Sequence, residues 1–280
     1  MYNKINKRAK VSFKSSPLNK IFLFSDFDGT LVPIRKDPQK VVLSLSAQKV
    51  LRLLSEKIPI AIVSGRSLNF LQKKIAIPKI FLAGNHGLEI KMGKDQFVHP
   101  QARSCKIQIK RLVRSLKKIF LGTDGVLIED KGLTLTLHYR LVVPRKREAV
   151  CNLFYDYFKI FNEAERLKIS KGKMSLEIRP NIDWGKKDAI RWILEMYKKR
   201  FPKRTVIPIY IGDDETDRAA LAWIKKIGLS IFVGDAKVTT IKATYFLPSQ
   251  GKCIELLRQI QLELGDDTAP GGKKAPQSAF

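Results

Sequence analysis

The sequence has few cysteines and no long apolar segment. Its three cysteines, Cys105, Cys151 and Cys253, are widely separated and form no C-x-x-C pair, which argues against a disulfide framework or a zinc site. We expect all three to be small buried hydrophobic residues. No apolar run approaches the roughly 18 residues that a membrane-spanning helix needs. The first residues, MYNKINKRAKVSFK, are basic and lack the apolar core of a secretory signal, so we expect a cytoplasmic protein without membrane association.

Acidic residues are also scarce. Only 26 Asp and Glu stand against 53 Lys and Arg, so the formal net charge is +27. Such a charge attracts anions, which include nucleic acids, anionic membrane surfaces and phosphorylated small molecules. The chain has no RNP-like aromatic motif, zinc-finger spacing or helix-turn-helix signature, so we expect no specific nucleic-acid partner. A basic nucleic-acid-binding protein stays the non-enzymatic alternative.

Apolar patterning predicts two kinds of structure in the 280 residues. Short apolar strands alternate with helices early and late in the chain, which is typical of a parallel sheet covered on both faces. The predicted strands are 22–26, 59–65, 79–84, 206–212 and 229–234, and the predicted helices are 46–57, 67–75, 186–199, 217–228 and 252–264.

The middle of the chain follows another pattern. Two helical faces frame segments with strand alternation, which predicts an antiparallel α+β unit. The faces are Ile109, Leu112, Val113, Leu116 and Phe120, then Val150, Leu153, Phe154, Tyr157, Phe158 and Phe161. We therefore expect an α/β fold, a Rossmann-like parallel sheet core with an inserted α+β cap domain. The expected boundaries are a flexible basic arm at 1–20, core at 21–96 and 180–264, cap at 97–179, and a disordered tail at 265–280.

Polar side chains gather at the predicted carboxyl ends of the core strands, where ligands bind in such sheets. Asp26 and Asp28 follow the first strand in IFLFSDFDGTL, Ser64 follows the second, and Asp213 follows VIPIYIG. Lys186 stands just ahead of a helix predicted to begin near Asp188. Acids, a hydroxyl and an amine at one sheet edge are what a metal-assisted phosphate site requires.

The chemistry of these groups predicts their roles. Mg²⁺ commonly takes one or two protein carboxylates, and Asp26 and Asp213 suit those positions. A carboxylate can attack phosphorus to give an aspartyl-phosphate, and a second acid, Asp28, can protonate the leaving alkoxide and then activate water. Ser64 and Thr30 can donate hydrogen bonds to phosphoryl oxygens. Lys186 can offset the charge that develops there.

The motifs DFDGTL, SGR, a Lys before a helix, and GDDETD together resemble those of haloacid-dehalogenase-superfamily phosphohydrolases. GNHGLEI (84–90), EDKGLTLTLHYR (129–140) and GKMSLEIRP (172–180) further resemble trehalose-6-phosphate phosphatases. The resemblance covers roughly residues 20–260. It implies Mg²⁺-dependent hydrolysis of trehalose 6-phosphate and a cap that binds the sugar.

The resemblance also implies roles for single residues. Asp26 would be the nucleophile and Asp28 the general acid and base. The metal would be bound by the Asp26 and Asp213 side chains and the Asp28 carbonyl, with Asp214 and Asp217 supporting the metal or Lys186. The substrate-binding set would be Thr30, Arg66, Asn85, His86, Glu129, Lys131, Arg140, Lys173 and Glu177, with Asn85 and His86 at the hinge. We expect a monomer with a phosphosugar substrate, and a trehalose-6-phosphate synthase partner stays open.

Several alternatives remain at this stage. The cap, and not the core motifs, separates trehalose 6-phosphate from sucrose phosphate or mannosyl-3-phosphoglycerate. The family often has a Gly after the motif Lys, so a register shift would move the amine to Lys187; we favour Lys186. Ser64 could also cap the following helix. The cap residues Glu129, Lys131, Lys173 and Glu177 could instead form a solvated strand edge.

Overall fold

The structure, a computed structural model, describes residues 20–35, 37–162 and 165–265. The basic arm and the tail predicted at the two ends lie almost entirely outside these residues. Within them, no helix is both long and apolar enough to cross a membrane.

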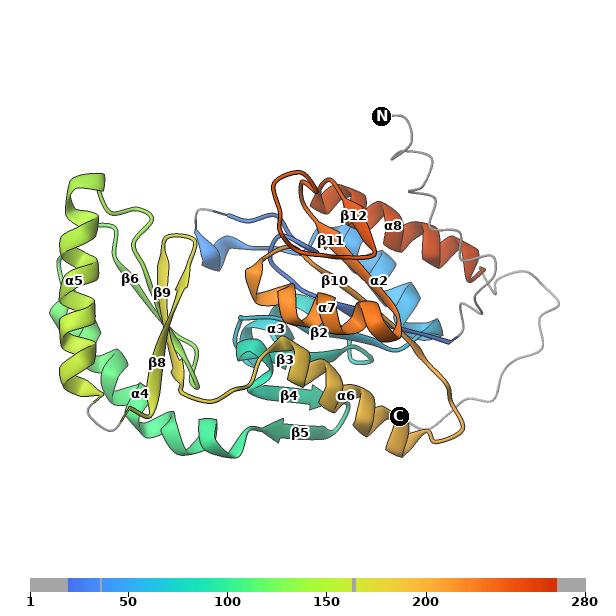
Figure 1. The fold of residues 1–280 in the computed structure, drawn as a ribbon, viewed down its shortest axis with the longest axis horizontal. Coiled ribbons are helices and arrows are strands. Elements are labelled where there is room, and N and C mark those ends of the chain that lie inside the picture. The colour runs from blue at the N-terminus through green and yellow to red at the C-terminus, as the bar shows by residue number, and fades with distance from the viewer. Residues whose placement is uncertain (1–19, 36, 163–164, 266–280) are drawn as a thin grey trace.

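The larger sheet has eight strands in the order β12-β11-β10-β1-β2-β3-β4-β5 (Figure 1). The six strands from β12 to β3 are parallel, and β4 and β5 add an antiparallel edge. Their bounds are β1 (Ile21–Ser25), β2 (Ile60–Val63), β3 (Phe81–Gly84), β4 (Glu89–Met92), β5 (Asp95–Val98), β10 (Ile207–Gly212), β11 (Leu229–Val233) and β12 (Tyr245–Leu247).

Helices cover both faces of this sheet, so its central strands are continuous apolar runs. All five residues of β1 are buried. The helices α2 (Leu45–Lys57), α3 (Leu68–Ile75) and α8 (Gln250–Glu263) bury their apolar faces on one side. The helices α6 (Lys186–Arg200) and α7 (Arg218–Ile227) do so on the other.

The smaller sheet is antiparallel, in the order β6-β7-β9-β8. Its strands are β6 (Leu127–Asp130), β7 (Leu135–His138), β8 (Leu167–Gly172) and β9 (Ser175–Pro180). The helices α4 (Pro100–Ile119) and α5 (Pro144–Phe161) pack on one face. In Figure 1, α5 lies on the side of the small sheet away from the large one, and α4 runs below the small sheet toward β5. The predicted α/β core with an inserted α+β cap is confirmed, and the small sheet with its two helices is called the cap below.

Short 3-10 turns complete the described structure: η3 (Pro38–Lys40), η4 (Asn85–Gly87) and η5 (Glu215–Asp217). The last two follow β3 and β10 at the carboxyl end of the large sheet. They therefore carry polar residues to the edge where the acids of the β1 loop also lie.

Three details differ from the sequence predictions. Leu153 is 47% exposed, because α5 turns only a narrow stripe toward the cap sheet. Cys151 is partly exposed, whereas Cys105 and Cys253 are buried as expected, and all three are free thiols. Lys186, which we placed just ahead of a helix, is itself the first residue of α6, since Gly185 is the N-cap.

Candidate active site

The loop after β1 carries Asp26 and contacts Asp213, which follows β10. Asp26 is buried at the end of the strand, and Thr30 Oγ1 donates a hydrogen bond to Asp213 Oδ1 at 3.1 Å. Gly29 has φ of +84°, and a Cβ built on it would fall 2.1 Å from Asp213 Oδ2. The turn therefore requires glycine both for its conformation and for the space that Asp213 fills.

Lys186 forms the centre of the charge arrangement. Its Nζ lies 2.9 Å from Asp26 Oδ1 and 2.7 Å from Asp217 Oδ1. Burial opposes its charge, but Asp217 and Asp26 outweigh burial and raise the pKa of Lys186 well above its ordinary value. Lys187, in contrast, is partly exposed, and its Nζ lies 3.6 Å from Asp188 Oδ1. The amine beside Asp26 is thus that of Lys186.

Asp217 is fully occupied by donors. Its Oδ1 accepts from Lys186 and from the Tyr210 hydroxyl, and its Oδ2 accepts from the backbone N–H groups of Asp213 and Asp214 at 3.0 and 3.1 Å. Four hydrogen bonds use the lone pairs of a carboxylate. We conclude that Asp217 fixes Lys186 and the Asp213 turn.

Carboxylate oxygens of Asp26, Asp213 and Asp217 lie within 4.8 Å of one another. Burial, opposed by Lys186 and assisted by the neighbouring acids, raises the pKa of Asp26 well above its usual range. Burial together with Asp217 and Asp214 raises the pKa of Asp213 to about 7. Crowded, buried oxygen donors of this kind suit a hard divalent cation. Because Asp217 is occupied, Asp26 and Asp213 are the side chains that could hold one.

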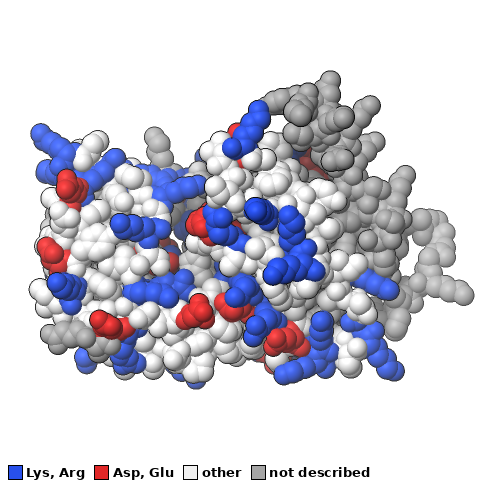
Figure 2. Space-filling model, viewed as in Figure 1, with Lys and Arg blue, Asp and Glu red and all other residues white. Residues whose placement is uncertain are grey.

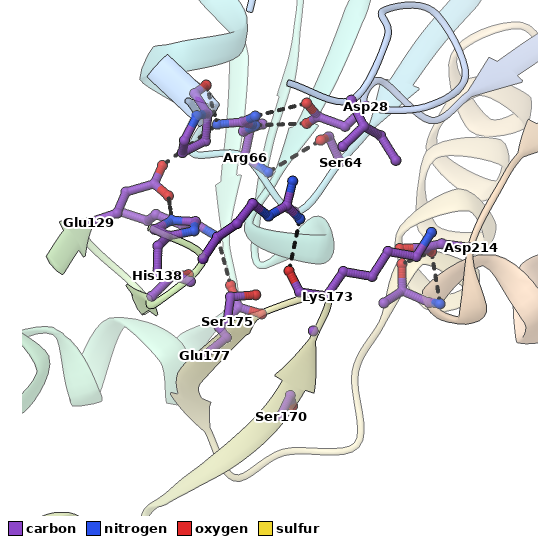
Figure 3. A pocket seen from close by; sticks show the side chains of 18 of the residues that line it. Asp28, Ser64, Arg66, Glu129, His138, Ser170, Lys173, Ser175, Glu177 and Asp214 are labelled. Atoms are coloured by element: carbon purple, nitrogen blue, oxygen red, sulfur yellow. Dashed lines mark hydrogen bonds and ion pairs between the residues drawn. The ribbon is translucent and has the colours of Figure 1, made fainter. Parts of the chain in front are cut away.

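Arg66 binds the other acid of the β1 loop. Its Nε and Nη2 donate to the two carboxylate oxygens of Asp28 at 2.7 and 2.8 Å, and Nη1 donates to the Pro38 carbonyl (Figure 3). Its Nη1 also lies 4.0 Å from Glu129 of the cap. The guanidinium that we assigned to substrate thus orients Asp28 and faces the cap.

Ser64 is buried beside this pair. Its Oγ accepts from the Arg66 backbone N–H at 3.2 Å. The N-cap of α3 is Ser67, so the alternative that Ser64 caps this helix is wrong. Ser64 lines the cavity, and within residues 20–35, 37–162 and 165–265 its hydroxyl donates no hydrogen bond.

The turn η4 lies in the core between β3 and β4, and its side chains contact the cap. Asn85, His86 and Gly87 have φ of 50°, 57° and 92°, a left-handed run that non-glycine residues rarely adopt. Asn85 Nδ2 donates to the Lys131 carbonyl at 3.0 Å, and its Oδ1 accepts from the cap hydroxyl of Thr134 at 2.8 Å.

His86, the next residue of η4, also contacts the cap. Its Nε2 lies 3.1 Å from Glu177 Oε2. Gly65 provides the room for this ring, because a Cβ there would lie 2.8 Å from it. The strained turn therefore positions two side chains against the cap.

Charged groups on the cap sheet are paired and largely shielded from solvent. Lys131 Nζ donates to Glu177 Oε1 at 2.9 Å, and His138 Nε2 lies 2.7 Å from Glu129 Oε2. Burial opposes ionisation of Glu177, but Lys131 and His86 outweigh it and hold its pKa well below the usual range. Burial likewise opposes ionisation of Glu129, whose pKa is lowered by His138, Lys131 and Arg66. Both acids are therefore carboxylates ready to accept hydrogen bonds.

A cavity of about 560 Å³ separates the core acids from the cap sheet. Thirteen of the sequence-predicted residues line it: Asp26, Asp28, Ser64, Arg66, His86, Glu129, Lys131, Arg140, Lys173, Glu177, Lys186, Asp213 and Asp214. The other three, Thr30, Asn85 and Asp217, do not line the cavity. They form hydrogen bonds with residues that do. Lys173 is exposed on the β8–β9 turn, where its carbonyl accepts from Arg140 Nη2 at 2.9 Å.

Sequence reasoning missed three residues of this arrangement. His138 ends β7 and lines the cavity, and Thr134 directly precedes this strand; the alternation in LTLTLHY was a signal that could have identified both. Tyr210 bonds Asp217 from within an apolar strand, where a tyrosine is read as part of the core.

Comparisons with known proteins identify the family. The sequence model of the family described as trehalose-phosphatase matches residues 24–250. Probable trehalose-phosphate phosphatase 4 of Oryza sativa subsp. japonica is 30% identical over 91% of this chain and 70% of that protein. Trehalose-phosphate phosphatase B of Arabidopsis thaliana is 31% identical over 82% of this chain and 64% of that protein. The chain thus spans about two thirds of these relatives.

A solved structure shares the fold. The C-terminal domain of trehalose-6-phosphate phosphatase from C. albicans superimposes with a TM-score of 0.72 at 25% identity, covering 86% of this chain and 93% of that domain. The resemblance inferred from the motifs is therefore confirmed. Because the family match extends over most of its length, this chain belongs to the trehalose-phosphatase family of phosphoric monoester hydrolases.

Proposed function

We propose that this chain hydrolyses trehalose 6-phosphate to trehalose and phosphate through an aspartyl-phosphate on Asp26. The observation that supports this most is the placement of Asp26, Lys186 and Asp213 on one wall of a cavity whose opposite wall is the polar face of the cap sheet. Phosphate chemistry belongs to the first wall and sugar recognition to the second.

The first half-reaction transfers the phosphoryl group. A carboxylate oxygen of Asp26 attacks phosphorus, and the bond between phosphorus and the sugar oxygen breaks. Asp28 donates a proton to that oxygen, so that trehalose leaves as an alcohol. Lys186 and the Ser64 hydroxyl stabilise the charge on the phosphoryl oxygens. Arg66 holds Asp28 in a fixed orientation through its two hydrogen bonds.

The second half-reaction restores the enzyme. The Asp28 carboxylate takes a proton from water, the water oxygen attacks phosphorus, and the bond to Asp26 breaks. Phosphate is released and both carboxylates return to their starting states. The same residue thus serves as acid and then as base.

The oxygen donors of buried Asp26 and half-buried Asp213 fit Mg²⁺, and we assign them to it together with the Asp28 carbonyl. When bound, Mg²⁺ offsets the negative charge that the carboxylates and the phosphoryl group bring together. Thr30 orients Asp213 through its hydrogen bond, which replaces the phosphate contact expected from the sequence. Asp217 orients Lys186.

On the cap, Glu129, Lys131 and Glu177 would bind sugar hydroxyls. Their exposure is low and their charges are paired, which disagrees with the alternative of a solvated strand edge. Lys173 is exposed, so it could reach the substrate only from the rim of the cavity.

Phosphate release from a panel of sugar phosphates, measured with Mg²⁺ and with a chelator, tests the proposal. The panel contains trehalose 6-phosphate, sucrose 6-phosphate and mannosyl-3-phosphoglycerate. We expect turnover of trehalose 6-phosphate to be fastest and to require Mg²⁺. Faster turnover of another member would replace the substrate assignment, and full activity in chelator would contradict the metal assignment.

A further inference from the structure

The polar face of the cap sheet is organised in rows across its four strands. Strand register places Glu129 opposite Thr136, Thr136 opposite Glu177, and Glu177 opposite Ser170. Residues directly opposite in antiparallel strands share a face. Because α4 and α5 cover the other face, this row looks toward the cavity, which all four residues line.

Thr136 differs from its neighbours in the row. Glu129 is paired with His138, and Glu177 with Lys131, His86 and Thr134. Thr136 is only 3% exposed, yet its Oγ1 has no hydrogen-bond partner among residues 20–35, 37–162 and 165–265.

A buried hydroxyl without a partner is uncommon in a folded protein. Thr134, two residues earlier and just before β7, is also buried but donates to Asn85 Oδ1 at 2.8 Å. A second unsatisfied polar atom lies close by on the same face: the Nε of Arg179, which also lines the cavity. Thr136 is the cross-strand neighbour of Glu177, and Arg179 is two residues from it on β9, so each of these neighbours of Glu177 has a polar atom that no described residue bonds.

We propose that the Thr136 hydroxyl is a specificity-determining contact that hydrogen-bonds one hydroxyl of the sugar held against the cap. This inference rests on the proposed function, since it needs a phosphosugar in the cavity. A sugar hydroxyl is donor and acceptor at once, and so it can pair with Thr136 and with a neighbouring carboxylate together. A site built to bond a hydroxyl rejects a substrate that lacks it.

The test compares Thr136→Val with the parent enzyme. Valine keeps the shape and the β-branch and removes only the hydroxyl. We expect kcat/KM for the phosphosugar to fall about tenfold, while hydrolysis of p-nitrophenyl phosphate, which has no sugar for the cap to bind, stays unchanged. Thr136→Ser should retain activity toward both substrates.

Monodeoxy analogues of trehalose 6-phosphate distinguish a direct contact from a structural role. If Thr136 only supported the fold, its substitution would not change the effect of any one missing hydroxyl. In the parent enzyme each missing hydroxyl lowers kcat/KM by its own factor. We expect one analogue to lose its penalty in Thr136→Val, because the contact is already absent. Ser104→Ala, which removes an exposed hydroxyl of α4 that does not line the cavity, is the control and should leave the pattern of penalties unchanged.

Each result separates the two proposals. Equal kcat/KM in Thr136→Val and parent, with the same analogue penalties, would overturn the contact and leave the proposed function standing. Equal loss toward phosphosugar and p-nitrophenyl phosphate would show a structural role and also overturn it. A parent enzyme that hydrolyses p-nitrophenyl phosphate and no phosphosugar would refute the proposed function, and the inference with it.

Discussion

At the residue scale, the raised pKa of Asp213 predicts how the stability of the protein depends on pH and on Mg²⁺. Burial raises its pKa from the unfolded value of 3.8 to about 7. Folding therefore favours the protonated form, and the contribution of this group to stability falls as pH rises from about 4 to 7. At pH 8 without metal the charged carboxylate destabilises the fold.

We accordingly expect metal-free Asp213→Asn to melt above the parent at pH 8. Mg²⁺ at about 100 times its Kd should raise the stability of the parent by about 2.7 kcal/mol and that of Asp213→Asn by much less. Calorimetry with chelator and with Mg²⁺ measures both effects. Asp156→Asn, on the exposed face of α5, is the control and should behave as the parent. Equal stabilisation of parent and Asp213→Asn by Mg²⁺ would remove Asp213 from the metal site.

Single site residues were predictable to different degrees. Asp26 and Asp213 follow apolar strands, and sequence order alone places such residues at one sheet edge. The hydrogen-bond partners of Arg66 and Thr30 were not predictable from the sequence. Those partners are far away along the chain, and only folding brings them within bonding distance. Asp28 was expected to be the acid and base and Asp213 a metal ligand, but Arg66 and Thr30 were assigned to substrate and not to these two acids.

At the element scale, the β1 loop depends on Gly29. Gly29→Ala adds a Cβ that would overlap Asp213 Oδ2 and places a side chain at φ of +84°. We expect Asp213 to be displaced, so that the concentration of Mg²⁺ for half-maximal activity rises at least about tenfold, the equivalent of 1.4 kcal/mol. Mg²⁺ titration of phosphate release measures this.

A matched glycine separates backbone strain from steric displacement. Gly93, in the turn between β4 and β5, has φ of +61°, and a Cβ there meets nothing within 4 Å. Gly93→Ala should cost about 1 kcal/mol of stability and leave the Mg²⁺ dependence unchanged. If Gly29→Ala also lowers only stability, Asp213 does not depend on the glycine turn.

Helices and strands whose apolar residues follow one clear pattern were predictable. Continuous apolar runs gave β1, β2, β3, β10 and β11, and Leu135 and Leu137 alternate with threonines as a half-buried strand requires. The strands β4 and β5 were not predicted, because EIKM and DQFV are short and mix charged with apolar residues. Their pairing with the edge of β3 supplies the stability that their own pattern does not indicate.

At the scale of the whole molecule, charge governs how substrate arrives. The net charge is +27, and Figure 2 shows Lys and Arg spread over both parts of the visible face. A dianionic sugar phosphate is attracted by such a field. We expect kcat/KM to fall several-fold as salt rises from about 20 to about 200 mM, because the Debye length shortens to less than 10 Å.

In the same titration kcat should hardly change, since the bound complex is shielded from ions by the cap. Steady-state kinetics over the salt series separate kcat from KM. Sodium chloride and potassium acetate at matched ionic strength control for specific ion effects. A salt-independent kcat/KM would mean that the basic surface does not steer the substrate.

The division of the cavity between the acids of the core and the polar face of the cap sheet was predictable from chain order. The contacts between core and cap were not. Motif position places the cap between two halves of the core. The joining side chains, Asn85 and His86, owe their direction to a left-handed turn that no apolar period reveals.

The central claim is that Asp26 receives the phosphoryl group while Asp28 handles the protons. The most direct test uses Asp28→Asn with p-nitrophenyl phosphate, whose leaving group needs no proton, so that only the second half-reaction is slowed. The account predicts a burst of one p-nitrophenol per enzyme, followed by slow turnover, with a phosphoryl group on the peptide that carries Asp26. Linear release without a burst, and no phosphorylated Asp26 in the quenched enzyme, would contradict it.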